Sequence, residues 1–188
     1  MNDIKMAKGF TLIEVVVTLS VVAILSAILI PLISNNIKSA RFTKAKSDVV
    51  AVKDAIVKFR YDLGKWPVFD NTNTFNNLLY GSGNRLTGSS WETSTNRKLS
   101  LRYNLIDNTN NYTKGPSKDG TPVWNGPYLG KIKADPWGST YLVNSIAFNI
   151  NNRRVWVLSA GKDKTISVPL NGSSDPQVNS DDIFEYLK

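Results

Sequence analysis

Carboxylates, lysines and hydroxyls are the side chains with which this 188-residue chain must do any chemistry, because it contains neither histidine nor cysteine. That composition excludes a Ser-His-Asp or Cys-His nucleophile, a CxxC redox pair, and a zinc or haem site with His or Cys ligands. The residues with a suggestive position are a lone glutamate, Glu14, and three late aspartates, Asp163, Asp181 and Asp182. A membrane-anchored enzyme that uses a carboxylate pair is a distant alternative, since no sequence feature places such a pair in a pocket.

Glu14 is the only charged residue in the 24-residue segment Phe10–Ile33. A carboxylate deep in a bilayer costs about 2.5–3.5 kcal/mol, and the segment offers no lysine or arginine as a partner. If the chain were cut after Gly9, the new α-amine of Phe10 would be a cation for the Glu14 of a neighbouring copy. The unpaired charge would then serve assembly.

The same segment is long enough to cross a membrane. As a helix it would extend about 35 Å, against a bilayer core of about 30 Å. The alternative is a cleaved secretory signal, but such apolar regions have about 7–15 residues and end at an A-x-A-like site. The sequence from Phe10 to Ile33 is longer and has no such end. We therefore expect a membrane-competent helix.

The residues around the proposed cut carry a family resemblance. Lys8 to Glu14, with the letters KGFTLIE, resemble the class III signal of type IV prepilins and type II secretion pseudopilins. The resemblance implies that a prepilin peptidase cleaves after Gly9 and methylates the new N-terminal Phe10. It also implies an assembly role for Phe10, Glu14 and Pro31. A proline within a helix removes one hydrogen bond, so the backbone before Pro31 can open.

Beyond Pro31 the pattern becomes amphipathic. Apolar residues recur at intervals of three and four, and lysines and arginines occupy the other faces, which predicts a helix with one face packed on a globular head. A coiled-coil seam is the competing interpretation, although only three heptads are present. Gly64 and the pair Trp66-Pro67 predict the end of the helix. The predicted stripe consists of Phe42, Ala45, Val49, Val52, Ile56, Phe59 and Leu63.

The region from 66 to 123 is rich in loops. It has ten asparagines between positions 71 and 111. Thr74 could cap a short helix that continues to Tyr80, and short strands are expected near Leu99–Ile106. The Gly81-Ser82-Gly83 triplet lacks the Lys-Ser/Thr that follows in a phosphate loop, so it predicts no phosphate site.

The C-terminal region, 124–188, predicts a small antiparallel sheet. Turn sequences, GPYL at 126–129 and DPWG at 135–138, precede two β-rich runs, Ser139–Val143 and Arg154–Leu158. These segments, together with the aspartate pair at 181–182, are similar to the major pseudopilin of type II secretion systems. The resemblance covers residues 5–67 and 124–183 and implies the type IV pilin fold.

The resemblance also implies a calcium ion that ties the C-terminal loop to the sheet. Carried over to this sequence, the side-chain ligands would be Asp163, Asp181 and Asp182, with the carbonyl of Leu158. Clustered carboxylates and carbonyls suit a hard cation that prefers oxygen. The alternative is structural: Asp182 and Glu185 could form a capping box that starts a last helical turn.

The sequence thus predicts an α+β chain, a long N-terminal helix packed on a small antiparallel sheet. The resemblance implies a structural, non-enzymatic subunit of a type II secretion pseudopilus that helps to drive protein export. The expected segments are a cleaved leader (1–9), a transmembrane and filament-core helix (10–33), an amphipathic helix (34–65), a variable region (66–123) and the sheet with its C-terminal loop (124–188). The alternative function is a type IV pilus subunit for adhesion, motility or DNA uptake.

The resemblance implies several partners. They are further copies of the chain in a helical filament, minor pseudopilins, the inner-membrane assembly platform, the prepilin peptidase, and membrane lipid before assembly. Nucleic acid is expected only if the filament is a DNA-uptake pilus. The expected location is the bacterial inner membrane, with the leader in the cytoplasm and the head periplasmic or extracellular.

Positive charge argues against that topology. The chain carries a net charge of +8. Four cations follow the apolar segment, and only Asp48 opposes them. This positive charge is greater than that of Lys5 and Lys8 in the leader. Flanking charge alone would therefore place the C-terminus in the cytoplasm. We give priority to the processing signal, which needs a cytoplasmic leader. The four cations are Lys38, Arg41, Lys44 and Lys46.

Overall fold

The structure is a computed structural model that describes residues 9–86, 91, 97–115, 119–175 and 181–188. These residues form two compact units, one up to Arg41 and one from Phe42 to Lys188, which we call the head. The leader lysines Lys5 and Lys8 lie outside the described residues. The helices are α1 (Leu12–Leu63), α2 (Leu101–Leu105) and the 3-10 helix η2 (Ser145–Asn149), and the strands are β1 (Leu78–Tyr80), β2 (Lys98–Ser100), β3 (Leu142–Val143), β4 (Trp156–Ser159) and β5 (Ile183–Tyr186).

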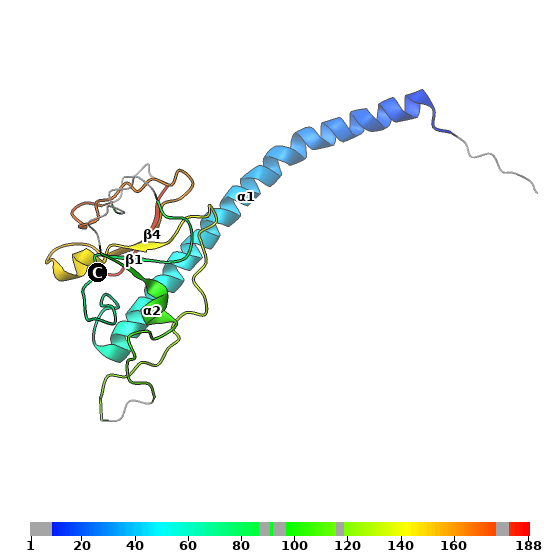
Figure 1. The fold of residues 1–188 in the computed structure, drawn as a ribbon. Helices are drawn as coiled ribbons and strands as arrows, with labels where there is room; N and C mark the ends of the chain where they lie inside the picture. Colours follow the sequence, from blue (N-terminus) through cyan, green and yellow to red (C-terminus); the bar gives the residue numbers. More distant parts are fainter. Residues whose placement is uncertain (1–8, 87–90, 92–96, 116–118, 176–180) are drawn as a thin grey trace, which may run out of the picture. The chain divides into compact units, whose positions relative to one another are not determined.

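Helix α1 contributes to both units (Figure 1). It runs through Pro31, and the apolar side chains of residues 12–33 are exposed. Among the described residues it is the one helix long and apolar enough to cross a membrane. Its end agrees with the prediction, because Gly64 adopts a positive φ of 68° and its N–H donates to the Arg60 carbonyl at 2.8 Å.

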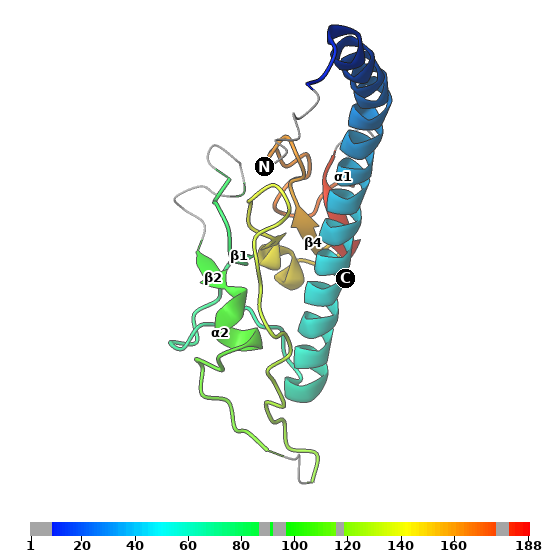
Figure 2. The same cartoon turned by 90° about the vertical axis from the view of Figure 1, so that its right-hand side faces the viewer.

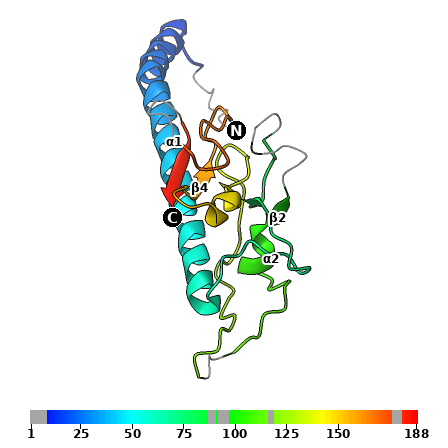
Figure 3. The same ribbon diagram turned by 90° about the vertical axis from the view of Figure 1, so that its left-hand side faces the viewer.

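The five strands in the described part of the head form one sheet in the order β2-β1-β3-β4-β5. Three of its four pairings are antiparallel, as predicted, whereas β1 and β2 run parallel. The prediction of a long helix packed on a small sheet is confirmed, and the purely antiparallel sheet is corrected to a mixed one. Figures 2 and 3 show β5 beside the head part of α1, where Lys53 of α1 pairs with Glu185 of β5 at 3.3 Å.

Side chains alternate along each strand, so each face of the sheet contributes to its own buried cluster. Leu79, Val143 and Val157 are aligned across neighbouring strands and pack in the same cluster as α1. Leu142 and Leu158 occupy the opposite face, in a second cluster with Trp91 and Val168 from the loops. The residues that α1 buries are Ala45, Val49, Val52, Ala55, Ile56, Phe59 and Leu63. Phe42, predicted in this stripe, is 52% exposed.

Three local predictions were wrong. The stretch after Thr74 forms strand β1 at Leu78–Tyr80 instead of a helix, since it pairs with β2 and β3. The expected strand at Leu99–Ile106 is a strand only to Ser100, whose hydroxyl then caps the short helix α2. The helical turn considered after Asp182 is strand β5, which is held by its pairing with β4.

Candidate functional site

The predicted cleavage site lies in exposed, non-helical chain. Gly9 and Phe10 precede the first residue of α1, Leu12, and the Phe10 side chain is 87% exposed. A Cβ added at Gly9 would meet no atom within 4 Å. The junction is therefore sterically open on its described side, and the roles of both residues remain predictions.

Glu14 has a local role that the sequence analysis missed. Its Oε2 accepts hydrogen bonds from the backbone N–H and the hydroxyl of Thr11, both at 2.8 Å. In return, the Glu14 N–H donates to the Thr11 hydroxyl at 3.3 Å. This reciprocal pair is a capping box at the start of α1, and its T-x-x-E signature was visible in the sequence. None of the described lysines or arginines forms an ion pair with Glu14, so its charge is available to another chain.

Asp181 connects the start of β5 to the turn that follows β4. Its Oδ2 accepts from the backbone N–H groups of Lys162, at 2.6 Å, and Asp163, at 3.0 Å. Gly161 allows this approach, because it has a φ of 63° and an added Cβ would lie 2.3 Å from the Asp181 carbonyl oxygen. The backbone at this point requires glycine. The structure therefore joins two of the predicted ligand residues, Asp163 and Asp181, through one hydrogen bond.

Asp182 is the buried member of the set. Its Oδ2 accepts from the N–H of Ser167, at 2.9 Å, and from the Ser167 hydroxyl, while its Oδ1 is buried and has no hydrogen-bond partner among the described residues. Burial raises the pKa of Asp182, and the negative charges of Asp181 and Asp163 raise it further. The bonds from Ser167, a residue that the sequence analysis did not identify, oppose this rise in the pKa.

The fit of a calcium ion to these residues is partial. The unpartnered Oδ1 of Asp182 and the mutual repulsion of the three carboxylates are features that a hard cation would relieve. However, Asp163 Oδ1 already accepts from the Thr165 N–H at 2.8 Å, and Leu158 lies inside the sheet between β3 and β5. Over the described part of the chain, no group of three acidic side chains is arranged to hold a metal. The aspartates share a neighbourhood without forming a complete ligand shell.

The DPWG turn supports the end of β4. Asp135 Oδ1 accepts from the N–H groups of Trp137, at 3.0 Å, and Ser139, at 2.7 Å, and its Oδ2 accepts from the Ser159 hydroxyl at 2.6 Å. Gly138 closes the turn with a φ of 87°. The predicted turn is confirmed, and it fixes the point from which residues 160–163 emerge.

Comparisons with known proteins match the N-terminal segment and, more weakly, most of the chain. Residues 4–30 match the prokaryotic N-terminal methylation motif. The chain is 26% identical over 136 residues to the type II secretion system core protein G of Escherichia coli K12, which covers 72% of this chain and 70% of that protein. The protein of the same name from Pseudomonas aeruginosa is 27% identical over 71% of this chain and 70% of its own length. The one from Aeromonas hydrophila is 36% identical over 31% of this chain and 41% of its own. No solved structure matches this chain.

Proposed function

We propose that this chain, a homologue of type II secretion system core protein G, is the repeating structural subunit of a type II secretion pseudopilus. The observation that carries the proposal is an apolar helix, exposed over residues 12–33, that begins within a methylation motif and continues into a head with an apolar core. A helix with no apolar partner in its own chain must be covered by lipid or by other helices. The core of the head uses only the later part of α1, where the buried residues run from Ala45 to Leu63.

Assembly follows from the same residues. Cleavage after Gly9 by a prepilin peptidase would remove the leader and expose the Phe10 α-amine, which the enzyme then methylates. In the filament, Glu14 of one subunit pairs with the Phe10 ammonium of a neighbour, and the apolar helices pack together around the filament axis. The single hydrogen bond that Pro31 removes allows the helix to adjust within that packing.

The proposal includes a location and partners. The helix anchors the subunit in the bacterial inner membrane, with the leader in the cytoplasm and the head on the periplasmic side. Further copies of the chain, minor pseudopilins and an inner-membrane platform complete the machine, in which this subunit has a mechanical role. A subunit of a surface pilus is the other candidate, because the methylation motif matches the same residues in either case.

The proposal also includes calcium at the C-terminal loop. Asp163, Asp181 and Asp182 would supply carboxylate oxygens, and the Leu158 carbonyl remains the weakest of the predicted ligands because it lies within the ladder. A bound ion would neutralise the three carboxylates and join the start of β5 to the loop after β4. Support for it comes from the buried, unpartnered Oδ1 of Asp182.

A deletion strain distinguishes the two filament functions. Loss of the gene should stop export of secreted enzymes into the medium and leave surface adhesion and motility unchanged. Complementation with the wild type should restore export, whereas Gly9→Leu should not, because a bulky residue at the cut keeps the leader attached. A strain that secretes normally but loses adhesion would indicate that the chain is a subunit of a surface pilus.

A further inference from the structure

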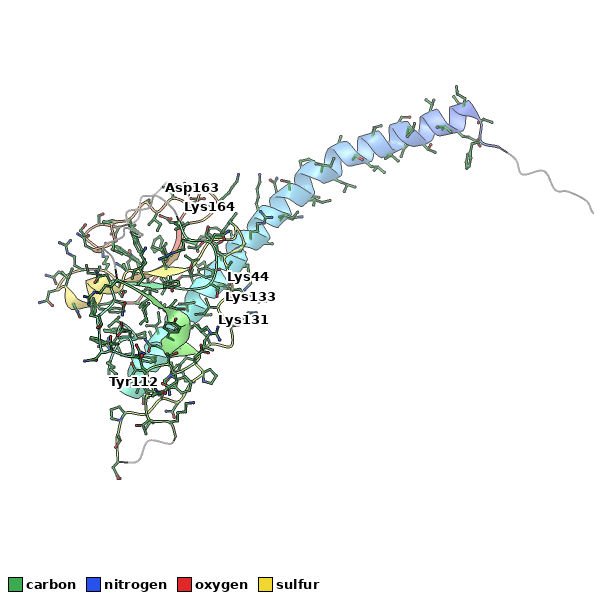
Figure 4. The ribbon with its side chains drawn as sticks, viewed as in Figure 1. Lys44, Tyr112, Lys131, Lys133, Asp163 and Lys164 are labelled. Carbon is green, nitrogen blue, oxygen red and sulfur yellow. The ribbon has the colours of Figure 1, made fainter. Side chains whose placement is uncertain are left out.

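A basic hollow lies in the head where α1 faces the loop after Tyr128 (Figure 4). It has a volume of about 190 Å³ and is lined by three lysines, one from α1 and two from the loop. Apolar atoms form much of its wall, with Val52 and Ile132 among them. The lysines are Lys44, Lys131 and Lys133.

The loop lysines are held outward by the residue between them. Ile132 is 6% exposed and packs so closely on Gly81 that an added Cβ there would lie 2.6 Å from the Ile132 methyl carbon Cγ2. Lys131 and Lys133, on either side of this anchor, are both exposed. Neither forms an ion pair or hydrogen bond with any other residue that the structure describes. Their positive charges are therefore uncompensated.

Asp48 does not cancel that surplus. It pairs with Lys44 one turn earlier on α1 and accepts a hydrogen bond from the Tyr141 hydroxyl at 2.9 Å. Three lysines against one aspartate give the lining a net charge of +2. A concave site with several ammonium groups and one engaged carboxylate attracts an anionic group of small size.

We propose that this hollow docks the headgroup phosphates of anionic phospholipids, so that the head rests on the membrane surface before the subunit enters a filament. Lys44 follows Ile33 by only eleven positions, a helical length of about 16 Å, which keeps the hollow near the lipid headgroups. Lys38 and Arg41 lie on that short connection and add to the attraction. This inference rests on the membrane anchorage proposed above, but not on the pseudopilus role.

The proposal also accounts for the unexpected charge distribution. Flanking cations usually remain on the cytoplasmic side, yet the processing signal places these on the opposite side. A lipid-docking role gives them a function after export of the head. An acidic protein segment could satisfy the same charges, but the tether holds a lipid surface within reach at all times.

The test uses the full mature chain in vesicles. Because the chain has no cysteine, Gly130→Cys gives a single labelling site, at a glycine where an added Cβ would meet nothing within 4 Å. The fluorescence of a label at this position is measured in phosphatidylcholine vesicles that contain or lack phosphatidylglycerol. In both kinds of vesicle a quencher is attached to the lipid headgroups. Quenching should require phosphatidylglycerol. Lys131→Gln with Lys133→Gln should weaken docking about 25-fold, since each lysine at an anionic surface contributes about fivefold.

Matched variants separate specific docking from net charge. Lys58→Gln with Lys65→Gln removes the same charge near the C-terminal end of α1 and should change docking less than about twofold. Lys131→Arg with Lys133→Arg should retain docking, because both positive charges are kept. Equal losses in both glutamine pairs, or no dependence on phosphatidylglycerol, would overturn the proposal. So would release of the head by inorganic phosphate at matched ionic strength, which would indicate a site for free phosphate.

Flotation of the vesicles distinguishes the possible failures. If the chain does not float with the vesicles, the proposed anchorage fails. If it floats normally but the probe is not quenched, only the docking proposal fails. If the lysine pair affects filament yield without affecting quenching, the hollow binds another subunit, and the lipid proposal is wrong.

Discussion

Glu14 caps its own helix, and we propose that its charge also pairs with a neighbouring subunit. The capping box satisfies backbone donors at the start of α1 within the single chain. Capping needs only an acceptor, whereas the proposed pairing with the Phe10 ammonium needs a negative charge. Substitutions that keep one property and remove the other can therefore separate the two functions.

Glu14→Gln keeps an acceptor for Thr11 but removes the charge, so we expect it to reside in the membrane and build few filaments. An ammonium left unpaired among apolar helices costs about 3–5 kcal/mol, which is enough to prevent subunit addition. Thr11→Ala, the matched control, keeps the charge and loses only about 1 kcal/mol of capping. Filament yield is measured by shearing and electron microscopy. Normal yield in Glu14→Gln cells would limit Glu14 to capping.

Asp182 gives the calcium proposal a test with a defined sign. In chelator, the raised pKa means that the folded head holds this proton more tightly than the unfolded chain. Its contribution to the free energy of unfolding is fully present below the ordinary aspartate pKa and is lost as the pH rises through the raised value. Asparagine does not ionise, so Asp182→Asn does not lose this stability as the pH rises. The difference in melting temperature between variant and wild type should therefore shift in favour of the variant as the pH rises towards neutrality.

At neutral pH, calcium should make the wild type more stable than Asp182→Asn. It should stabilise the wild type by about 2.7 kcal/mol at a hundredfold excess over its dissociation constant, and Asp182→Asn much less. The measurement is a melting curve of the full mature chain in detergent, with calcium and then with chelator. Identical midpoints in calcium and chelator for the wild type would reduce the three aspartates to turn-forming residues.

At the scale of elements, the head depends on one face of α1. Phe59 is fully buried and makes edge-on contacts with Tyr112 and Tyr128, with ring centroids 5.6 and 5.7 Å apart. Phe59→Ala should therefore lower the free energy of unfolding by about 3–5 kcal/mol. Val57→Ala, on the same helix at 45% exposure, should change it by less than about 1 kcal/mol. Thermal melts followed by circular dichroism measure both, and similar midpoints for the two variants would contradict the observed helix packing.

Helical elements were more predictable than strands because their signals are local. The apolar spacing of α1 and the stop at Gly64 are written in consecutive residues, and both agree with the structure. The stretch from Thr74 to Tyr80 has apolar residues at helical spacing too, but the partners that make it a strand are about 20 and 60 residues away. β5 was missed for the same reason, since its pairing with β4 crosses 24 or more residues.

The same distinction between local and long-range signals applies to the candidate site. Gly9, Phe10 and Glu14 belong to one contiguous motif and could be identified without any structure. The aspartates could be named only through the family resemblance. What the sequence could not provide is the contact of Asp181 with the 161–163 turn, or the bonds from Ser167 that hold Asp182. Those contacts span 15 to 19 residues and depend on how the loops close over the sheet.

At the scale of the whole molecule, the chain joins an apolar segment of α1, residues 12–33, which no described residue buries, to a head with two apolar clusters of its own. The described part of the head therefore does not require the membrane interior, and we propose that the N-terminal signal decides its side of the membrane. The flanking charge and the N-terminal signal predict opposite sides of the membrane for the head. The cations after Ile33 favour retention in the cytoplasm, while the methylation motif at residues 4–30 favours export of the head.

A pair of reporter fusions at Lys188 decides between the two orientations of the chain in the membrane. If the signal prevails, alkaline phosphatase fused there should be active in cells, because that enzyme requires the oxidising environment outside the cytoplasm to form its disulfides. A cytoplasmic reporter at the same position should be inactive. Replacing Lys38 and Arg41 by glutamine should leave this pattern unchanged, since the cations are not what orients the chain. An inactive phosphatase with an active cytoplasmic reporter would reverse the topology and place the head in the cytoplasm.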